Sequence, residues 1–370
     1  MNQGDKILVT GGAGFIGSHI VDKLVEIGYD VTIIDNLSST KTKPDYLNPK
    51  ANLIVGDIAD YNLLMKIIPN VEVIFHLAAS VGIAQSNYEI DSFTDNNCTG
   101  TAILLKAIVN SGKKPKLIVS TSNTTYGEGL YYCNKCQVNF HPKIRTNEEI
   151  EKYGFEPICD RCKSPSKSVP TDENTSLDCN SIYALNKKYQ EESCLITGKL
   201  YGFPVVALKY FNVFGPRQSL NNPYTGVNAI FISRIKNNNP LIIYEDGLQT
   251  RDFISVHDVV EANILAMNNE NASGKVFNIG SGKAITINEL ALKLYEIMGK
   301  EPKIGVNRLY RKGDIRHCIA DNRKAKEFLN WEPKISFEEG LREIVKWSEN
   351  EKAEDNFEKA NRELKEKGLI

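Results

Sequence analysis

One glycine-rich segment restricts the fold of this chain more than any other feature of its sequence. The segment TGGAGFIGSH, Thr10 to His19, directly follows the apolar run KILVT and opens a helical pattern that ends at Gly28. Its glycines Gly11, Gly14 and Gly17 have a GxxGxxG spacing, which permits a tight turn, close approach of a pyrophosphate and close packing of helix on strand. This strand, turn and helix predict the first unit of a dinucleotide-binding sheet, with the phosphates at the helix N-terminus.

Short apolar runs alternate with helical patterns through the first half of the chain. We expect strands over residues 6–10, 30–34, 52–55, 71–76, 116–120 and 205–209. We expect helices over residues 15–27, 61–68, 99–111, 183–197, 287–298 and 337–347. Strands that alternate with helices imply parallel crossover connections. The predicted fold class is therefore α/β, with a Rossmann-type doubly wound parallel sheet.

The pattern also predicts how the chain is divided. Residues 1–210, with residues 250–265 returning to them, are expected to form the dinucleotide-binding domain. Residues 211–249 and 266–350 are expected to form a smaller C-terminal substrate domain. Residues 128–170 interrupt the first domain as a cysteine-rich insertion, and residues 351–370 form a charged helical tail. We interpret the tail as a solvated appendage or a packing arm.

Composition excludes several classes of function. The formal net charge of −1 gives no electrostatic reason to expect a nucleic-acid partner. No apolar run approaches the ~18 residues that a membrane span needs. The first residues enter a predicted strand at once and lack the apolar core of a signal peptide. We therefore expect a cytoplasmic protein.

An acidic residue favours NAD over NADP as the dinucleotide. Asp35 ends the second predicted strand, 24 residues after Gly11, where a carboxylate can accept both ribose hydroxyls and repel a 2′-phosphate. Asp57 and Ile58 follow the third strand, where the adenine amino group is expected. The run HLAA, residues 76–79, ends the fourth strand with small side chains that leave room for the cofactor. His76 itself is interpreted as a packed core histidine.

Three further residues predict proton transfer. Tyr183 and Lys187 lie four apart in a helical pattern and therefore share one face. Tyrosine has a pKa near 10, so a neighbouring ammonium and a positive nicotinamide are expected to lower it. Ser122 lies at the carboxyl end of the fifth strand, where ligands bind in such sheets. Its hydroxyl can bond the substrate oxygen from which Tyr183 takes a proton.

The insertion carries two CxxC pairs. Cys133 and Cys136 are separated from Cys159 and Cys162 by 22 residues, which suits one tetrahedral Zn²⁺ held by four thiolates in a zinc-ribbon-like site. Four ligands leave no open position, so the metal is expected to be structural. Disulfides and unliganded thiols are the alternatives, and His141 could replace one cysteine. The insertion could cover the substrate pocket or form an interface.

Taken together, the motifs resemble those of the extended short-chain dehydrogenase/reductase family, in its nucleotide-sugar epimerase/dehydratase branch. The resemblance covers nearly everything outside the insertion and the tail. It is carried by TGGAGFIGSH, DNL, GDI, HLAA, NCTGT, STSNTTYG, YALNK, KYFNVFGPRQ, DGLQTRDFISVHDV, FNIGSG and GDIRHCIADNRKAKEFLNWEPK.

This resemblance implies roles for individual residues. Those expected to hold NAD, besides the three glycines, are Phe15, Ile16, Asp35, Asn36, Asp57, Ile58, Leu77, Ala78, Ala79, Asn97, Tyr183 and Lys187. Ser122, Tyr183 and Lys187 are the expected catalytic residues. Those expected to bind the nucleotide-diphosphate sugar are Ser122, Asn212, Arg251, Arg311 and Asp314. Two arginines are natural clamps for a diphosphate.

The resemblance also narrows the reaction. Dehydratases of the family carry an Asp-Glu pair directly after the catalytic hydroxyl, and decarboxylases carry a glutamate at the second of these positions. Asn123 and Thr124 stand there in this chain, and neither side chain transfers a proton efficiently. We therefore expect 4-epimerisation, in which a hydride leaves C4 for NAD⁺ and returns to the opposite face of a rotated keto sugar.

Substrate and assembly are expectations from the resemblance alone. The insertion and the segment NNPYTGVNAIF, residues 221–231, are most similar to the dTDP-L-rhamnose 4-epimerase branch, which acts on dTDP-L-rhamnose and dTDP-6-deoxy-L-talose. UDP-glucose or UDP-N-acetylglucosamine 4-epimerases are the alternative. A homodimer through the helices of Thr101 and Tyr183 is expected. A non-catalytic NAD sensor is the alternative to an enzyme, and the intact Ser122, Tyr183 and Lys187 argue against it.

Overall fold

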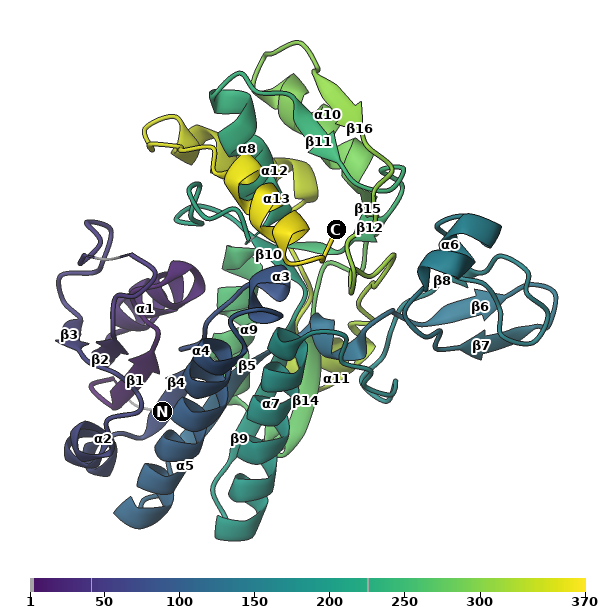
Figure 1. Cartoon of the computed structure of the whole chain (residues 1–370). Coiled ribbons are helices and arrows are strands. Elements are labelled where there is room, and N and C mark those ends of the chain that lie inside the picture. The colour runs from purple at the N-terminus through teal and green to yellow at the C-terminus, as the bar shows by residue number, and fades with distance from the viewer. Residues whose placement is uncertain (1–2, 41, 225) are drawn as a thin grey trace.

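The computed structural model describes residues 3–40, 42–224 and 226–370, so Thr225 of the 221–231 segment lies outside the described residues. Its centre is a parallel seven-stranded sheet in the order β14-β9-β5-β4-β1-β2-β3 (Figure 1). The strands are β1 (Lys6–Thr10), β2 (Asp30–Asp35), β3 (Asn52–Val55), β4 (Val73–His76), β5 (Lys116–Ser122), β9 (Val205–Tyr210) and β14 (Lys275–Ile279). The predicted Rossmann-type parallel sheet is confirmed.

The sheet changes direction of winding between β1 and β4. Thr10 at the end of β1 pairs with Ile34 of β2 on one side and with His76 of β4 on the other. Ligands bind at such a switch point in open α/β sheets, outside the carboxyl ends of the strands. The fold therefore places the glycine-rich loop and the HLAA segment at the edge where a dinucleotide is expected.

Helices cover both faces of the sheet and bury its apolar side chains. One face carries α1 (Phe15–Ile27), α9 (Val256–Asn268) and α11 (Arg323–Leu329). The other face carries α2 (Tyr61–Ile67), α5 (Gly100–Ser111) and α7 (Ile182–Tyr201). Each layer has its own core, because helices on both sides bury the central strands, while the edge strand β3 stays partly exposed. Near the switch point lie the short helices α3 (Ile83–Ser86) and α4 (Ile90–Thr94).

The division between the domains differs from the expected one. Strand β14 pairs with β9, with Lys275 opposite Val206, so part of the expected substrate domain completes the Rossmann sheet. Trp331, just after α11, is fully buried and its indole N–H donates to the carbonyl of Asp258 in α9 at 3.0 Å. The domain to which a segment belongs depends on its contacts with residues distant in sequence. Local sequence periodicity gives no information about those contacts.

The remaining C-terminal elements pack around a second apolar core. Its strands form three pairs, β10 (Asn212–Phe214) with β13 (Phe253–Ser255), β11 (Leu241–Ile243) with β16 (Ile304–Val306), and β12 (Thr250–Arg251) with β15 (Ile285–Thr286). Its helices are α8 (Val227–Lys236), α10 (Ile287–Ile297) and α12 (Phe337–Ser348). Helix α8 is not among the helices expected from the sequence.

The insertion is a small separate lobe at the side of the molecule (Figure 1). Its antiparallel sheet has the order β7-β6-β8, from β6 (Tyr131–Cys133), β7 (Val138–Phe140) and β8 (Lys167–Ser168). Helix α6 (Asn147–Tyr153) begins with a capping box between Thr146 and Glu149.

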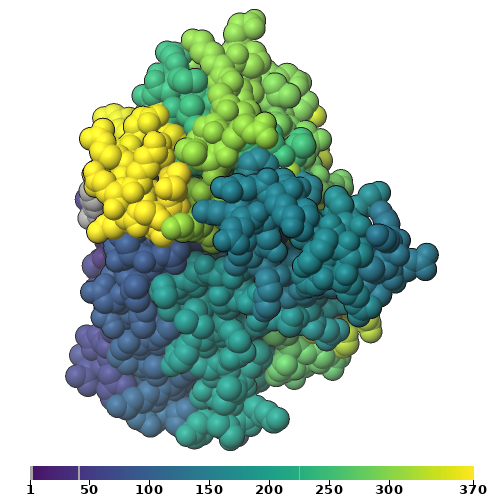
Figure 2. All heavy atoms as spheres, turned by 45° about the vertical axis from the view of Figure 1, so that its right-hand side comes forward, coloured from purple at the N-terminus to yellow at the C-terminus, as the bar shows by residue number. Residues whose placement is uncertain are grey.

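The tail packs against the body of the protein. Helix α13 (Phe357–Glu366) buries Ala360 and Leu364, and Glu363 accepts a hydrogen bond from the Tyr224 hydroxyl. Figure 2 shows the tail in yellow against both the blue residues of the first domain and the green residues of the second. Of the two interpretations of the tail, the structure agrees with a packing arm. Within the described residues, no helix has the length and apolarity needed to cross a bilayer.

Candidate active site

The glycine-rich loop lies tightly against the end of β4. Gly11 has a φ of +70°, and a Cβ there would lie 2.7 Å from the backbone nitrogen of Ala78. A Cβ on Gly17 would overlap the carbonyl oxygen of Gly11. Gly14 is the N-cap of α1 and has no side chain, so the first-turn N–H groups of α1 keep no side-chain partner there. The residues present therefore form a cradle that fits a pyrophosphate.

Asp35 connects this loop to the end of β2. Its Oδ2 accepts from the Ala13 N–H at 3.0 Å and its Oδ1 accepts from the Leu37 N–H at 2.8 Å. Each carboxylate oxygen keeps a further lone pair, so the side chain still fits a ribose diol. Asn36 Nδ2 donates to Asp57 Oδ2 at 2.9 Å, which joins two more of the predicted cofactor residues.

The segment after β4 is held by side chains on both sides. The Leu77 N–H donates to the Thr10 carbonyl at 3.1 Å, and the Ala78 N–H donates to Thr10 Oγ1 at 3.3 Å. The fully buried Asn97 amide bonds the Ser80 backbone in both directions, at 2.7 Å and 3.1 Å. Asn97, predicted to hold NAD, therefore uses its side chain to fix this loop. Ala79 lies within the fixed segment, and buried Ile58 packs beneath Gly100.

His76 is a core residue. Its ring nitrogens lie 2.8 Å from Thr10 Oγ1 and 2.9 Å from Thr101 Oγ1. Burial, together with the nearby charge of Lys187, lowers the pKa of His76 to about 3. The imidazole is therefore neutral at physiological pH and links the ends of β1 and β4 to α5.

The three predicted catalytic residues come together. Tyr183 and Lys187 lie on the face of α7 that covers β5, and Ser122 ends that strand. All three side chains are buried, and the Lys187 ammonium donates to the Ser120 carbonyl at 3.1 Å. The Ser122 side chain acts to lower the pKa of Tyr183.

The charge state of this group differs from the expectation. Burial is the larger effect and raises the pKa of Tyr183 to about 12, against the smaller effect of Ser122. Burial also lowers the pKa of Lys187 to about 8. We had expected the ammonium to lower the tyrosine pKa. In the cofactor-free chain desolvation dominates, because it disfavours the charged form of each group.

Two residues that the sequence did not indicate position Tyr183. The Tyr183 N–H donates to Ser86 Oγ at 2.9 Å, and the Ile182 N–H donates to Asn87 Oδ1 at 3.1 Å. Ser181 caps the same helix by accepting from the Ala184 N–H. Ser86 and Asn87 lie almost a hundred residues before α7, so no local pattern could have connected them to it.

The loop that contains Arg311 and Gly313 lies against the start of α7. Gly313 has a φ of +87°, and a Cβ there would lie 3.0 Å from the Asn180 carbonyl oxygen. A Cβ on Gly127 would overlap the Asp178 carbonyl oxygen. The end of β5, the start of α7 and the loop that contains Arg311 are therefore adjacent.

The predicted substrate residues include two arginines whose guanidinium groups are held in place by hydrogen bonds. Arg311 donates from Nε to Asp314 Oδ2 at 2.7 Å. The partly buried Arg251 guanidinium donates to three backbone carbonyls, those of Thr250, Ile315 and Arg316, at 2.8 to 3.2 Å. Carbonyls orient a guanidinium without neutralising it, so Arg251 retains charge for an anion. Asn212 Oδ1 is buried and has no hydrogen-bond partner among the described residues.

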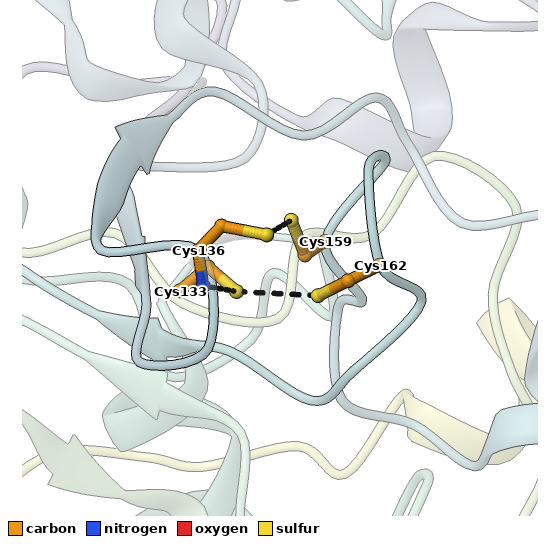
Figure 3. Close-up of side chains that lie close together, drawn as sticks. All are labelled: Cys133, Cys136, Cys159 and Cys162. Carbon is orange, nitrogen blue, oxygen red and sulfur yellow. Dashed lines mark hydrogen bonds between the residues drawn. The ribbon is translucent and has the colours of Figure 1, made fainter.

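The four CxxC cysteines form one cluster (Figure 3). Their sulfur atoms all lie within 4.8 Å of one another, with Cys133 Sγ 3.5 Å from Cys162 Sγ and Cys136 Sγ 4.0 Å from Cys159 Sγ. All four are free thiols, so the disulfide alternative is not seen. The His141 ring contacts the carbonyls of Tyr126 and Glu128 and is not part of the cluster.

The two CxxC turns have the same backbone form. The Gln137 N–H donates to the Cys133 carbonyl and the Lys163 N–H donates to the Cys159 carbonyl, each at 2.8 Å. Gln137 and Lys163 occupy equivalent left-handed positions, with φ of 53° and 56°. This repeated turn is what presents the four sulfurs to a common centre.

A separate cavity of about 880 Å³ lies between the insertion and the start of α11. Its lining includes Tyr132, Asp172, Asn322 and Arg323 and none of the predicted site residues. We therefore assign the active site on the geometry at the sheet edge and not on cavity size.

Sequence comparison identifies relatives across almost the whole chain. Residues 7–280 match the NAD dependent epimerase/dehydratase family. A dTDP-L-rhamnose 4-epimerase of Burkholderia thailandensis is 33% identical over 93% of this chain and 95% of its own. A UDP-N-acetyl-alpha-D-glucosaminuronate decarboxylase of Bacillus cytotoxicus is 32% identical over 92% and 97%.

Solved structures show the same fold. A UDP-glucose 4-epimerase of Thermotoga maritima, solved with UDP-glucose, is 37% identical and superposes with a TM-score of 0.77 over 93% of this chain and 98% of its own. A UDP-glucose 4-epimerase of Thermus thermophilus, solved in complex with NAD, is 27% identical with a TM-score of 0.75, over 94% and 100%.

Proposed function

The chain belongs to the NAD dependent epimerase/dehydratase family, the extended short-chain dehydrogenases/reductases, and we propose that it is a nucleotide-sugar 4-epimerase. The observation that carries this proposal is the joint burial of Ser122, Tyr183 and Lys187 at the carboxyl edge of the sheet, with the Lys187 ammonium bonded to the Ser120 carbonyl. A non-catalytic NAD sensor has no need of this arrangement.

The cofactor site supports NAD. Gly11, Gly14 and Gly17 form the cradle for the pyrophosphate, and Asp35 offers its free lone pairs to the ribose diol. The carboxylate also disfavours a 2′-phosphate at that position through like-charge repulsion. When bound, NAD supplies a hydride acceptor for the oxidation and the hydride donor for the reduction.

Proton movement is assigned to Tyr183. Its phenolate accepts the proton of the sugar C4 hydroxyl as the C4 hydride leaves, and the phenol returns that proton when the hydride comes back. Ser122 donates a hydrogen bond to the same sugar oxygen. This bond stabilises the carbonyl of the keto sugar that exists between the two hydride transfers. The Lys187 ammonium favours the phenolate, helped by the positive charge of the oxidised cofactor.

The residues after Ser122 favour epimerisation over elimination or decarboxylation. Thr124 stands where decarboxylases of the family carry a glutamate, and its hydroxyl donates to Ser122 Oγ at 3.0 Å. Asn123 is almost fully buried. With no carboxyl group at either position, the chemistry available is reversible oxidation at one carbon.

We assign the nucleotide diphosphate to Arg251, Arg311, Asp314 and Asn212. Arg251 supplies an unneutralised guanidinium, and the open Asn212 acceptor suits a donor on the ligand. Firm binding at this end leaves the sugar free to turn between the two hydride transfers.

For the substrate we favour dTDP-L-rhamnose and dTDP-6-deoxy-L-talose. The support is the 33% identity to the Burkholderia enzyme together with the cysteine-rich insertion. UDP-glucose or UDP-N-acetylglucosamine is the second candidate, favoured by the 37% identity to the Thermotoga enzyme.

The cysteine cluster is proposed to hold one structural Zn²⁺. Four thiolates bound at about 2.3 Å in a tetrahedron lie about 3.8 Å apart. The two sulfur separations of 3.5 Å and 4.0 Å bracket that value, so the residues present fit the metal. Elemental analysis of purified protein is expected to give one zinc per chain in the wild type and none after Cys133 and Cys159 are both replaced by serine.

A homodimer through α5 and α7 is proposed as the assembly. Helix α7 exposes Leu185, Tyr189, Ile196 and Leu200 along one stripe, and Leu200 is 74% exposed. These residues follow the i, i+4, i+11, i+15 pattern of a single helix face. An apolar stripe of this kind on a large helix is suited to a self-complementary interface.

Conversion of a sugar panel tests the function. The purified chain, without added cofactor, is incubated with UDP- and dTDP-linked hexoses and 6-deoxyhexoses, and products are separated by chromatography. We expect one or more C4 epimer pairs to interconvert, and Tyr183→Phe to lose at least about a hundredfold in rate. A chain that binds NAD yet converts none of the panel would support the sensor instead.

A further inference from the structure

The insertion is joined to the loop that contains Arg311 by a cluster of charges with a buried centre and two partly exposed members, Glu156 and Asp246. This bridge consists of Glu128, Arg145 and Glu156 from the insertion and Glu245, Asp246 and Arg316 from the second domain. Arg316 is 0% exposed, and Glu128, Arg145 and Glu245 are also buried. Charges this deep are tolerated only when paired, so the two halves of the bridge depend on each other.

The pairing crosses between the two parts of the chain. Arg145 of the insertion contacts Glu128 at 3.3 Å and Glu245 at 3.1 Å. Arg316 of the second domain pairs with Glu245 at 2.7 Å, and its Nε donates to Glu156 Oε1 at 2.8 Å. Glu245 therefore accepts from one arginine on each side, and neither part can move without breaking an ion pair.

The bridge contacts residues 314–316, a segment whose carbonyls also accept hydrogen bonds from Arg251. Both Glu128 oxygens accept from the Arg316 N–H at 2.9 Å, and Arg145 Nη2 donates to the Asp314 carbonyl at 3.2 Å. The carbonyls of Ile315 and Arg316 in turn accept from the Arg251 guanidinium. The segment has no helix or strand of its own, so these contacts set the position of its carbonyls.

The cysteine lobe positions the insertion half of the bridge. Glu156 lies three residues before Cys159, Glu128 lies five residues before Cys133, and Arg145 Nη1 donates to the Phe155 carbonyl at 2.7 Å. The lobe is too small to bury much apolar surface, so its shape depends on the four sulfurs being held together.

We propose that the insertion positions the diphosphate site. The contacts run from the cysteine lobe to the bridge, from the bridge to the carbonyls of residues 315 and 316, and from these carbonyls to Arg251. The inference rests on the proposed role of Arg251 in binding the nucleotide. It assigns Glu156 as a positioning residue, and it makes metal retention in the lobe and nucleotide binding at Arg251 energetically coupled. Coupling of this kind acts equally in both directions.

The test compares Glu156→Gln with Glu151→Gln, an exposed glutamate on α6 in the same lobe. UDP and dTDP binding are measured separately by calorimetry on the full chain with its metal. We expect Glu156→Gln to weaken binding about tenfold, because a charge-assisted contact to Arg316 is lost, and Glu151→Gln to match the wild type. KM for the converted sugar rises by the same factor while kcat stays within about twofold. A residue with only a structural role would lower the melting temperature without raising KM selectively over kcat.

Zinc release to a chromophoric chelator provides the reciprocal readout. In the wild type, saturating UDP or dTDP is expected to slow release about tenfold, and in Glu156→Gln this protection is lost. Nucleotide binding that leaves zinc release unchanged in the wild type, or equal affinities in the two variants, overturns this inference alone. Failure of both UDP and dTDP to bind the wild type overturns the proposed function and the inference with it.

Discussion

The Thr124 hydroxyl donates to Ser122 Oγ at 3.0 Å, and the Thr124 backbone N–H approaches the same oxygen at 3.3 Å. Both acceptor positions of Ser122 are thereby used, and its own proton is left to donate. It can be donated to the phenol of Tyr183, whose pKa the Ser122 side chain lowers. Thr124, which stands where other enzymes of the family carry a proton-transferring side chain, thus supports the Ser122 hydroxyl that we propose acts on the sugar oxygen.

Removing the hydrogen bond from the Thr124 hydroxyl to Ser122 is expected to slow the reaction modestly. Thr124→Val keeps the shape but loses the side-chain donor, so Ser122 can turn its proton away from the substrate. We expect kcat to fall about fivefold, the value of one neutral hydrogen bond, while Thr124→Ser stays close to the wild type. Steady-state rates at matched NAD content measure this, and equal rates for the valine and serine variants would count against it.

The pH dependence should report on Tyr183. Burial raises its pKa and the bond from Ser122 lowers it, so Ser122→Ala is expected to raise the pKa further. The reactive form is the phenolate, which is present above the pKa and lost as pH falls through it. The acid limb of kcat/KM should therefore move to higher pH in Ser122→Ala. An unchanged or lowered limb would show that Ser122 does not influence this ionisation.

Lys187 is expected to cost stability in the cofactor-free chain. Burial lowers its pKa from 10.5 to about 8, so between these values the unfolded chain binds more protons and the stability of the folded chain rises with pH. At pH 7 the buried ammonium costs up to about 3 kcal/mol. Lys187→Met should therefore be more stable than the wild type at pH 7, and the gap should close above pH 10.5.

Chemical denaturation of NAD-free protein at several pH values measures this gap. The matched control is Lys188→Met, because Lys188 lies next in α7, is partly exposed and pairs with Glu192. Its removal should change stability by less than about 1 kcal/mol. A Lys187→Met variant less stable than the wild type at pH 7 would mean that the ammonium is well paired in the fold.

The assembly can be tested on the exposed stripe of α7. Ile196→Glu combined with Leu200→Glu places two charges on the proposed interface and should convert the dimer to a monomer in sedimentation analysis. Leu292→Glu on α10 is the control, since Leu292 is 53% exposed on another helix. A wild type that sediments as a monomer, or a dimer that survives both α7 substitutions, would rule out this interface.

Local chemistry made much of the fold and site predictable. The glycine spacing, Asp35 at the end of β2 and the Tyr183–Lys187 helix depend on residues close in sequence, and periodicity also located most strands of the sheet. Long-range geometry was not predictable in this way. The addition of β14 to the sheet, the hydrogen bond from the Tyr183 N–H to Ser86 and the ion pair between Arg145 and Glu245 each join distant segments.

The charge state of the site was also beyond a sequence argument. A lysine one turn from a tyrosine suggests a lowered phenol pKa, yet the depth of burial reverses the direction in the free chain. How much water a group loses depends on the packing of β5 and α7 together, and neither segment alone contains that information.

The most direct test follows a C4-deuterated nucleotide sugar, from the pair that the panel identifies, through the purified chain without added cofactor. Hydride transfer away from C4 and back predicts that the epimer forms with deuterium still at its inverted C4, and that Tyr183→Phe suppresses this product. Release of the deuterium to water during epimerisation would contradict the account, because it would mean that C4 loses a proton and not a hydride.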